Sequence, residues 1–241
     1  MKVSVVVPAF NEERGLAASL RSIRAAMTAF DDARWATELI VCDNNSTDRT
    51  AEIAGAAGAE VVFEPVNQIS RARNAGATRA TGDWLLFVDA DSHPNRALCA
   101  DVLSAIESGR CIAGGSVVRF DETDAMVALV GGTWNVISRL MGWAAGSFIF
   151  CNAAVFRDIG GFSQALYAAE EIDLSRRLKR AGRRRGQRMV ILRRHPMLTS
   201  GRKARLYTPH EIFGFMARTI LSRGRTLRSA EACFSWYDGR R

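Results

Sequence analysis

The chain has 241 residues, of which 48% are hydrophobic and 24% are charged. This length suffices for one large α/β domain with a full core or for two small ones, and the composition is that of an ordinary globular protein. The first two thirds contain no segment of disordered composition. No run reaches the roughly 18 apolar residues that a membrane-spanning helix needs.

The net charge of +8 is unevenly distributed along the chain. Residues 1–175 contain 14 Lys and Arg against 22 Asp and Glu, whereas residues 176–241 contain 19 against 3. A basic end on an acidic body suggests an anionic partner, although a solvated arginine-rich surface is the alternative. Aromatic residues are sparse where the arginines are densest, so we expect no nucleic acid partner.

The cysteines favour a reducing compartment. Their number, five, is odd, and no two form a Cys-x-x-Cys pair, so we expect buried free thiols. The first residues contain no apolar segment followed by a signal-peptide cleavage site. We therefore expect a cytoplasmic protein, with peripheral attachment to the inner face of the membrane as a further hypothesis.

Strands and helices alternate along the first part of the chain. Short apolar runs predict buried strands at residues 2–7, 38–42, 60–63 and 84–88. Helices are predicted between them at 12–29, 48–57 and 70–80. This alternation is typical of βαβ units with a parallel sheet.

The second half of the chain is less regular. Its predicted strands are 113–120 and 190–192, and its predicted helices are 125–140 and 166–181. Residues 196–241 are basic, with an amphipathic stretch at 211–221.

Polar residues follow the predicted strands where ligands bind in parallel sheets, beyond the carboxyl ends. Asp89 and Asp91 come directly after the strand WLLFV. Two carboxylates at this spacing suit a hard cation such as Mg²⁺ or Mn²⁺ that also binds a diphosphate. A polar turn is the alternative for a bare Asp-x-Asp, and the apolar strand before the motif favours the metal site.

Other candidate residues allow two interpretations each. Asp43 suits hydrogen bonding to a nucleobase or ribose, or it begins the next helix. Arg73 suits a phosphate, or it is an exposed helix arginine. Glu170 and Glu171 suit a general base, because two close carboxylates raise one pKa, or they are favourable charges at a helix N-terminus. His195 is either a metal ligand or an ordinary histidine.

Five segments carry a family resemblance. SVVVPAFNEE, IVCDNNSTDRT, ARNAGATRATGDWLLFVDADS, GGF and EEIDLSRRLKRAG follow one another in this order. In order and spacing they closely resemble family-2 glycosyltransferases of the GT-A fold, over about residues 2–182. The resemblance implies a Rossmann-like, mostly parallel sheet flanked by helices, with a smaller acceptor-side region and a basic helical C-terminal segment.

The resemblance also implies an activity and assigns residues to it. It implies a hexosyltransferase that inverts the sugar in a single displacement from a UDP- or GDP-sugar to an acceptor hydroxyl, with Mn²⁺ or Mg²⁺. Glu171 matches the family's catalytic aspartate, with Glu170 as the alternative, and Asp91 matches the direct metal ligand, with Asp89 and His195 beside it. The residues expected to contact the donor are Pro8, Ala9, Asn11, Glu12, Asp43, Asn45, Arg73, Asp89 and Ala90.

The sequence departs from the family pattern in several places. The base position carries Glu, DNNSTD replaces the commoner DDGSTD, and Gln68 stands where a glycine often precedes Ala-Arg-Asn. There is no Gln-x-x-Arg-Trp motif of processive synthases, so we expect transfer of one sugar per encounter.

We expect residues 1–195 to form the glycosyltransferase domain. Residues 1–95 would be the nucleotide-sugar-binding half and 96–195 the acceptor-binding half, followed by a basic extension at 196–241. The amphipathic stretch in this extension fits an anionic membrane surface. As a hypothesis, it brings the enzyme to a lipid-linked or membrane-proximal acceptor.

Three alternative functions make different demands on the sequence. A nucleotidyltransferase of related fold would carry a glycine- and lysine-rich loop after the first strand, and PAFNEERG contains no lysine. A Rossmann oxidoreductase would need Gly-x-Gly-x-x-Gly, which is absent. A membrane-surface binding protein with a degenerate transferase domain is the non-enzymatic alternative.

Overall fold

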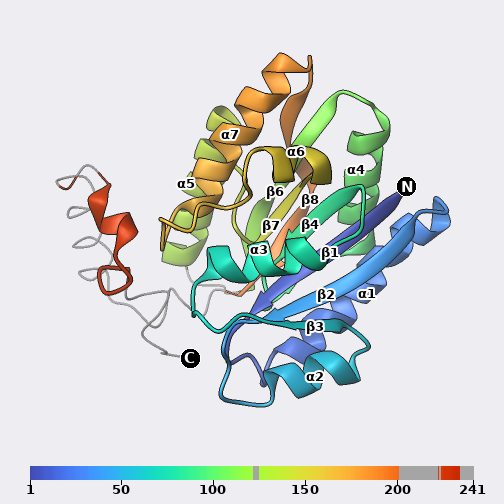
Figure 1. Ribbon diagram of the computed structural model, residues 1–241. Coiled ribbons are helices and arrows are strands. Elements are labelled where there is room, and N and C mark those ends of the chain that lie inside the picture. Colours follow the sequence, from blue (N-terminus) through green and yellow to red (C-terminus); the bar gives the residue numbers. More distant parts are fainter. Residues whose placement is uncertain (122–124, 201–221, 223, 234–241) are drawn as a thin grey trace.

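The computed structural model describes residues 1–121, 125–200, 222 and 224–233 (Figure 1). The strands are β1 (Lys2–Ala9), β2 (Ala36–Asp43), β3 (Glu60–Phe63), β4 (Trp84–Val88), β5 (Ser92–His93), β6 (Cys111–Phe120), β7 (Phe148–Asn152) and β8 (Arg188–Thr199). The helices are α1 (Leu16–Asp32), α2 (Thr50–Ala56), α3 (Ile69–Arg79), α4 (Arg96–Glu107), α5 (Ala125–Met141), α6 (Ala153–Asp158), α7 (Glu170–Arg184) and the 3₁₀ helix η1 (Arg225–Arg228).

The strands form one eight-stranded sheet in the order β3-β2-β1-β4-β7-β6-β8-β5. β3, β2, β1 and β4 run parallel, whereas β7 is antiparallel to both of its neighbours, β4 and β6. β6 and β8 run parallel to each other. This mostly parallel α/β architecture confirms the predicted fold class.

The sheet buries both of its faces because its central strands are apolar at nearly every position. Val5 and Val7 of β1 face a core that includes α1 and α4, whereas Val6 faces α3, α6 and α7. This follows from the two-residue period of a strand. Burial of each such side chain contributes about 1.5–3 kcal/mol.

Helix α3 lies unusually close to the sheet. A methyl group on Gly76 would lie 2.5 Å from Val6 Cγ1, so only glycine allows this approach. The close packing fixes the start of α3 against the carboxyl edge of the parallel strands. The polar residues of α3 are thereby held beside the candidate site.

The predicted elements match the structure best in the first half. The bounds of β3 and β4 were predicted correctly, and α1, α2 and α3 differ from prediction by a few residues. The predicted helix 166–181 begins only at Glu170, and the predicted strand 190–192 is part of the longer β8. α4, α6, β5 and β7 were not predicted.

The predicted amphipathic stretch 211–221 lies outside the described residues. Within the described chain, no helix has both the length and the apolar character that crossing a bilayer requires.

Candidate active site

Three polar segments meet at one edge of the sheet. β1 lies between β2 and β4 and runs parallel to both, with Ala9 opposite Asp43 and Val6 opposite Phe87. The chain therefore leaves all three strands in the same direction. The predicted donor segments Asn11–Glu12, Asp43–Asn45 and Asp89–Asp91 emerge together at this edge.

The loops after β1 and β2 are interlocked by hydrogen bonds. The backbone N–H of Asn11 donates to Ser46 Oγ at 2.9 Å, and that of Thr47 donates to Asn11 Oδ1 at 2.8 Å. The N–H of Glu12 donates to Thr50 Oγ1 at 2.8 Å. Asn11 and Asn45 have φ values of 51° and 66°, which asparagine adopts more readily than most residues. The two loops therefore form one preorganised unit.

Asp43 is buried at the base of this unit. Its Oδ1 accepts a hydrogen bond from the N–H of Ser46 at 3.1 Å, which supports the local turn. The start of α2 is served instead by Asp48, whose Oδ1 accepts from the N–H of Thr50 at 3.0 Å. Asp43 is thus not the cap of α2, and its role toward a nucleobase stays a prediction.

Arg73 is the centre of a buried ionic network. Its Nη1 donates to Glu170 Oε1 at 2.6 Å, and its Nη2 donates to Asp89 Oδ1 at 2.8 Å and to the carbonyl oxygen of Gly146 at 3.0 Å. The guanidinium also stacks over Phe162, 5.1 Å from the ring centroid. Burial opposes its charge, but Asp89 and Glu170 outweigh this and raise the pKa of Arg73.

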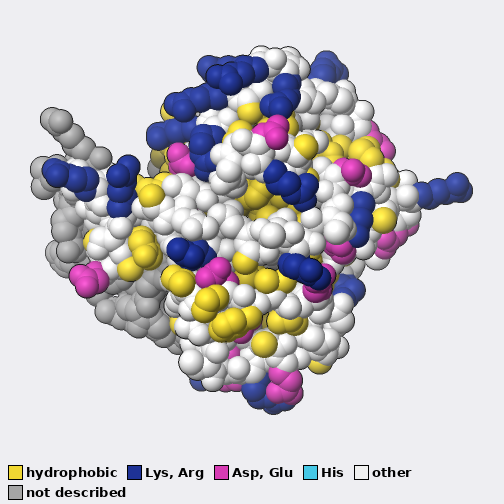
Figure 2. Space-filling view, viewed as in Figure 1, with side chains coloured by type: hydrophobic (Ala, Val, Ile, Leu, Met, Phe, Trp, Pro, Cys, Tyr) yellow, Lys and Arg dark blue, Asp and Glu magenta, His cyan; other side chains and the backbone are white. Residues whose placement is uncertain are grey.

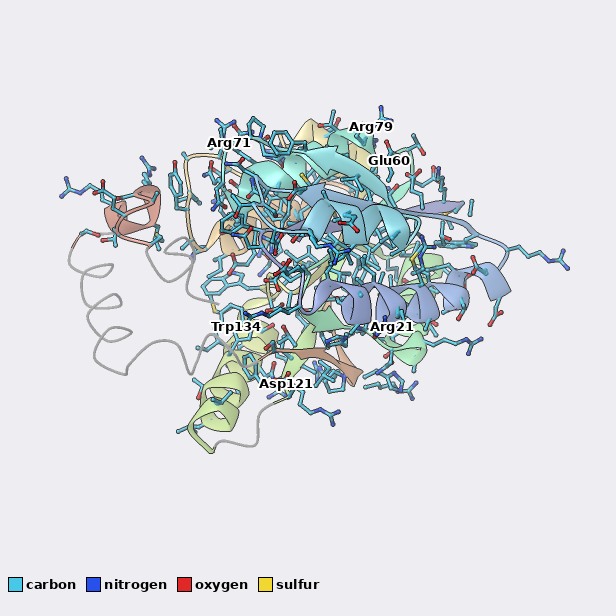
Figure 3. The ribbon with its side chains drawn as sticks, turned by 90° about the horizontal axis from the view of Figure 1, so that it is seen from below. Arg21, Glu60, Arg71, Arg79, Asp121 and Trp134 are labelled. Atoms are coloured by element: carbon cyan, nitrogen blue, oxygen red, sulfur yellow. The ribbon has the colours of Figure 1, made fainter. Side chains whose placement is uncertain are left out.

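This network corrects the expected role of Arg73. Only 1% of the Arg73 surface is exposed. The side chain binds Asp89 and Glu170 from the protein interior, whereas direct contact with the donor was expected. The nearby Arg71 lies on the outer side of α3, on the same side of the molecule as Arg79 (Figure 3).

The two adjacent glutamates at the start of α7 have different environments. Glu170 is 5% exposed and held by Arg73, so it is a structural partner. Glu171 is only partly buried, and desolvation together with the charge of Glu170 raises its pKa to about 8. A carboxylate with this pKa is a better proton acceptor than an ordinary glutamate. Glu170 is thus committed to Arg73, and the role of Glu171 as the base stays a prediction.

Helix α3 also holds the segment that leads into α7. Gln68 Nε2 donates to the carbonyl oxygens of Gln164 and Leu166 at 2.8 and 2.9 Å. The side chain of Asn74 makes two hydrogen bonds with the backbone of Phe162, each 2.9 Å long. With Arg73 on Glu170, three side chains of this region fix segment 162–170. The sequence had shown Gln68 only as a departure from the family pattern.

The metal motif lies at the end of β4. The Asp89 side chain is 27% exposed, and its Oδ1 is the atom that pairs with Arg73. The carbonyl oxygen of Asp91 accepts a hydrogen bond from the N–H of Ser200 at 3.2 Å. In the described part of the chain, no three His, Cys, Asp or Glu side chains cluster as a preformed metal site. One or two carboxylates plus a diphosphate suit Mg²⁺ or Mn²⁺.

Comparison with known proteins decides the family. Residues 4–159 match the model described as glycosyl transferase family 2. The chain belongs to this family. An uncharacterized glycosyltransferase of Mycobacterium tuberculosis is 34% identical over 113 residues, which is 47% of either chain. The match thus spans about half the length of this relative.

Solved structures share the fold of this family 2 chain. A mannosyltransferase from Pyrobaculum calidifontis, in complex with GDP-Man and Mn²⁺, has a TM-score of 0.65 at 20% identity. The match covers 84% of this chain and 59% of that one. Glucosyl-3-phosphoglycerate synthase from Mycobacterium tuberculosis, with Mn²⁺, UDP-glucose and phosphoglyceric acid, has a TM-score of 0.59 at 20% identity, covering 96% and 79%. At these identities the likeness shows the GT-A fold.

His195 of this family 2 chain is paired away from the metal motif. Its Nδ1 lies 2.9 Å from Asp101 Oδ2, on the side of β8 that faces α4. Ser200, which contacts Asp91, is five residues further along this part of the chain, about 16 Å at the rise of a strand. His195 therefore pairs with α4 in the structure, and its role as a metal ligand stays a prediction.

Proposed function

We propose that this chain is a non-processive, inverting hexosyltransferase that transfers a sugar from a nucleotide-diphosphate donor to an acceptor hydroxyl. The observation that carries the proposal is the buried bridge Asp89–Arg73–Glu170, which joins the metal motif to the start of the helix with the candidate base.

The interlocked loops after β1 and β2 are the proposed nucleoside site. Asp43, Asn11 and Glu12 would face the base and ribose, with Pro8, Ala9, Asn45 and Ala90 lining the same edge. Both structural neighbours described above were solved with Mn²⁺, one with GDP-Man and one with UDP-glucose. We therefore propose a UDP- or GDP-sugar as the donor and Mn²⁺ or Mg²⁺ as the metal.

The proposed reaction is a single displacement. Glu171 accepts the proton of the acceptor hydroxyl. The oxygen of that hydroxyl bonds to the anomeric carbon, and the bond from the anomeric carbon to the diphosphate oxygen breaks. A metal held by Asp91 and the outer oxygen of Asp89 would neutralise the charge that develops on the diphosphate. Attack on the face opposite the leaving group inverts the anomeric configuration.

The acceptor is proposed to be a hydroxyl compound, either free or lipid-linked. A nucleotidyltransferase is less favoured, because the loop after β1 carries no lysine.

The test is a screen of nucleotide-sugars for metal-dependent thermal stabilisation. A cognate donor at 100 times its Kd should add about 2.7 kcal/mol to the free energy of unfolding, and only with Mn²⁺ or Mg²⁺ present. The donor that stabilises is then incubated with candidate acceptors to detect release of the nucleoside diphosphate. If no UDP- or GDP-sugar stabilises the protein with either metal, the proposed function is wrong.

A further inference from the structure

Helix α5 presents an apolar stripe to solvent. The exposed fractions of Leu129 and Leu140 are 65% and 80%. Val136, Ile137, Leu129 and Leu140 share one face at helical spacing, and the exposed Met141 follows around the last turn of the helix. The stripe consists of Leu129, Val136, Ile137, Leu140 and Met141.

The stripe is long enough to be a contact surface. From Leu129 to Met141 the helix rises about 18 Å. Trp134 lies on the opposite, inner side, where it packs against the core, and α5 stands out from the body of the molecule (Figure 3). A contiguous exposed apolar surface of this kind marks a site of interaction.

Helix α7 and the first part of β8 supply a basic surface. Residues 174–194 contain ten Lys and Arg and no Asp or Glu. Arg176, Arg180 and Arg184 are exposed at intervals of four residues, so they share one face of α7. Figure 2 shows Lys and Arg side chains gathered over the upper left of the molecule, where Figure 1 places α7.

The apolar stripe and the basic surface are continuous. Lys179 Nζ donates to the carbonyl oxygen of Met141 at 2.5 Å, at the end of the stripe. The guanidinium of Arg176 lies 4.9 Å from the ring centroid of Trp143, two residues further along the chain. The apolar end of α5 is therefore bordered directly by cations of α7.

We propose that this α5–α7 surface docks on an anionic phospholipid bilayer. The apolar stripe would enter the boundary between head groups and acyl chains, while the arginines of α7 meet the negative surface. A nucleic acid would explain the arginines but would leave the exposed leucines without a partner. The proposal does not depend on the proposed transfer reaction, since it uses no residue of the candidate active site.

The test measures binding of the full chain to vesicles by sedimentation. We expect binding to vesicles of phosphatidylcholine with about 30% phosphatidylglycerol, weakening as salt rises, and little binding to phosphatidylcholine alone. Arg180→Gln with Arg184→Gln should weaken binding on the order of tenfold, because each basic residue near an anionic surface contributes. Leu129→Ser with Leu140→Ser should weaken it by a similar factor.

A matched control removes two arginines elsewhere. Arg21→Gln with Arg34→Gln, on and just after α1, should leave vesicle binding within twofold of the unchanged protein. Circular dichroism melts should show that all three double variants remain folded.

Four outcomes would overturn the proposal. These are equal binding to neutral and anionic vesicles, equal weakening by the control variant, unchanged binding in both test variants, and salt-sensitive binding to duplex DNA in the absence of vesicle binding. A dimer that Leu129→Ser with Leu140→Ser dissociates, without vesicle binding, would assign the stripe to contact between copies.

Discussion

Arg73 Nη1 lies 2.6 Å from Glu170 Oε1, and this ion pair joins residues 97 positions apart in a region almost closed to solvent. Through Nη2 the same guanidinium also holds Asp89. The end of β4 and the start of α7 are therefore connected by one side chain of α3. Loss of that side chain would leave the buried carboxylate of Glu170 and the half-buried one of Asp89 without their cation.

Arg73→Met should destabilise the protein strongly. Breaking a buried ion pair by removing one partner costs about 3–5 kcal/mol, because the remaining charge stays buried. Urea unfolding followed by circular dichroism measures the change. The control is Arg71→Met on the outer side of α3, which should change the free energy of unfolding by no more than about 0.5 kcal/mol.

Glu171→Gln should stop sugar transfer while leaving donor binding intact. An amide cannot accept the acceptor's proton, so kcat should fall by about 10²–10⁴. Calorimetric titration with the donor and Mn²⁺ should give an unchanged Kd. Should Glu171→Gln keep full rate while Glu170→Gln loses it, the base is Glu170.

The raised pKa of Glu171 predicts a pH-dependent stability difference. The protonated carboxyl is favoured in the folded state, so its contribution is fully present below the unfolded pKa of about 4.5 and is lost as pH rises to about 8. Glu171→Gln cannot ionise and does not lose this contribution. In metal-free protein, its Tm should be close to that of the unchanged protein at pH 5 and higher at pH 8. Equal differences at both pH values would contradict the raised pKa.

Substitution of Asp91 should abolish metal binding, whereas substitution of His195 should leave it intact. Asp91→Asn should abolish the stabilisation that Mn²⁺ and donor provide together, because a carboxylate ligand is lost. His195→Ala should retain that stabilisation, because His195 pairs with Asp101 of α4. Thermal denaturation with and without both ligands measures this. Loss of the metal effect in His195→Ala would restore the histidine as a ligand.

Gln68→Ala should lower kcat more than it weakens donor binding. The substitution removes the hydrogen bonds to the carbonyl oxygens of Gln164 and Leu166, so the segment before α7 loosens. A hydrogen bond of this kind contributes about 0.5–1.5 kcal/mol to stability. Gln164→Ala is the control, because it keeps the backbone carbonyl that Gln68 binds. A pure loss of stability with unchanged kcat would mean that Gln68 does not position the base.

The sequence predicted the parts of the fold that are dictated locally. β4 was predicted correctly because WLLFV is apolar throughout and all five residues are buried. The length of β8 was underestimated, because half-exposed residues interrupt its run of apolar side chains. Arg193, Arg194 and Pro196 interrupt it too. α4 was missed although Asn95 caps it, with Oδ1 accepting from the N–H of Leu98 at 2.8 Å.

The candidate site was predictable in its residue types but not in its pairings. Asp89 and Asp91 follow their strand as expected. The bridge by Arg73 and the pairing of His195 with Asp101 link residues 94–97 positions apart, and no local pattern encodes such contacts. Gln68 was visible only as an unusual residue, because its partners are backbone carbonyl oxygens, which every residue carries.

The interlocking of Asn11 with Ser46 and Thr47 has a consequence for how donor preference could change during evolution. Each loop is the scaffold of the other, so a mutation that reshapes one would shift both at once. Exchange of side chains that make none of these bonds would instead leave the backbone of both loops unaltered.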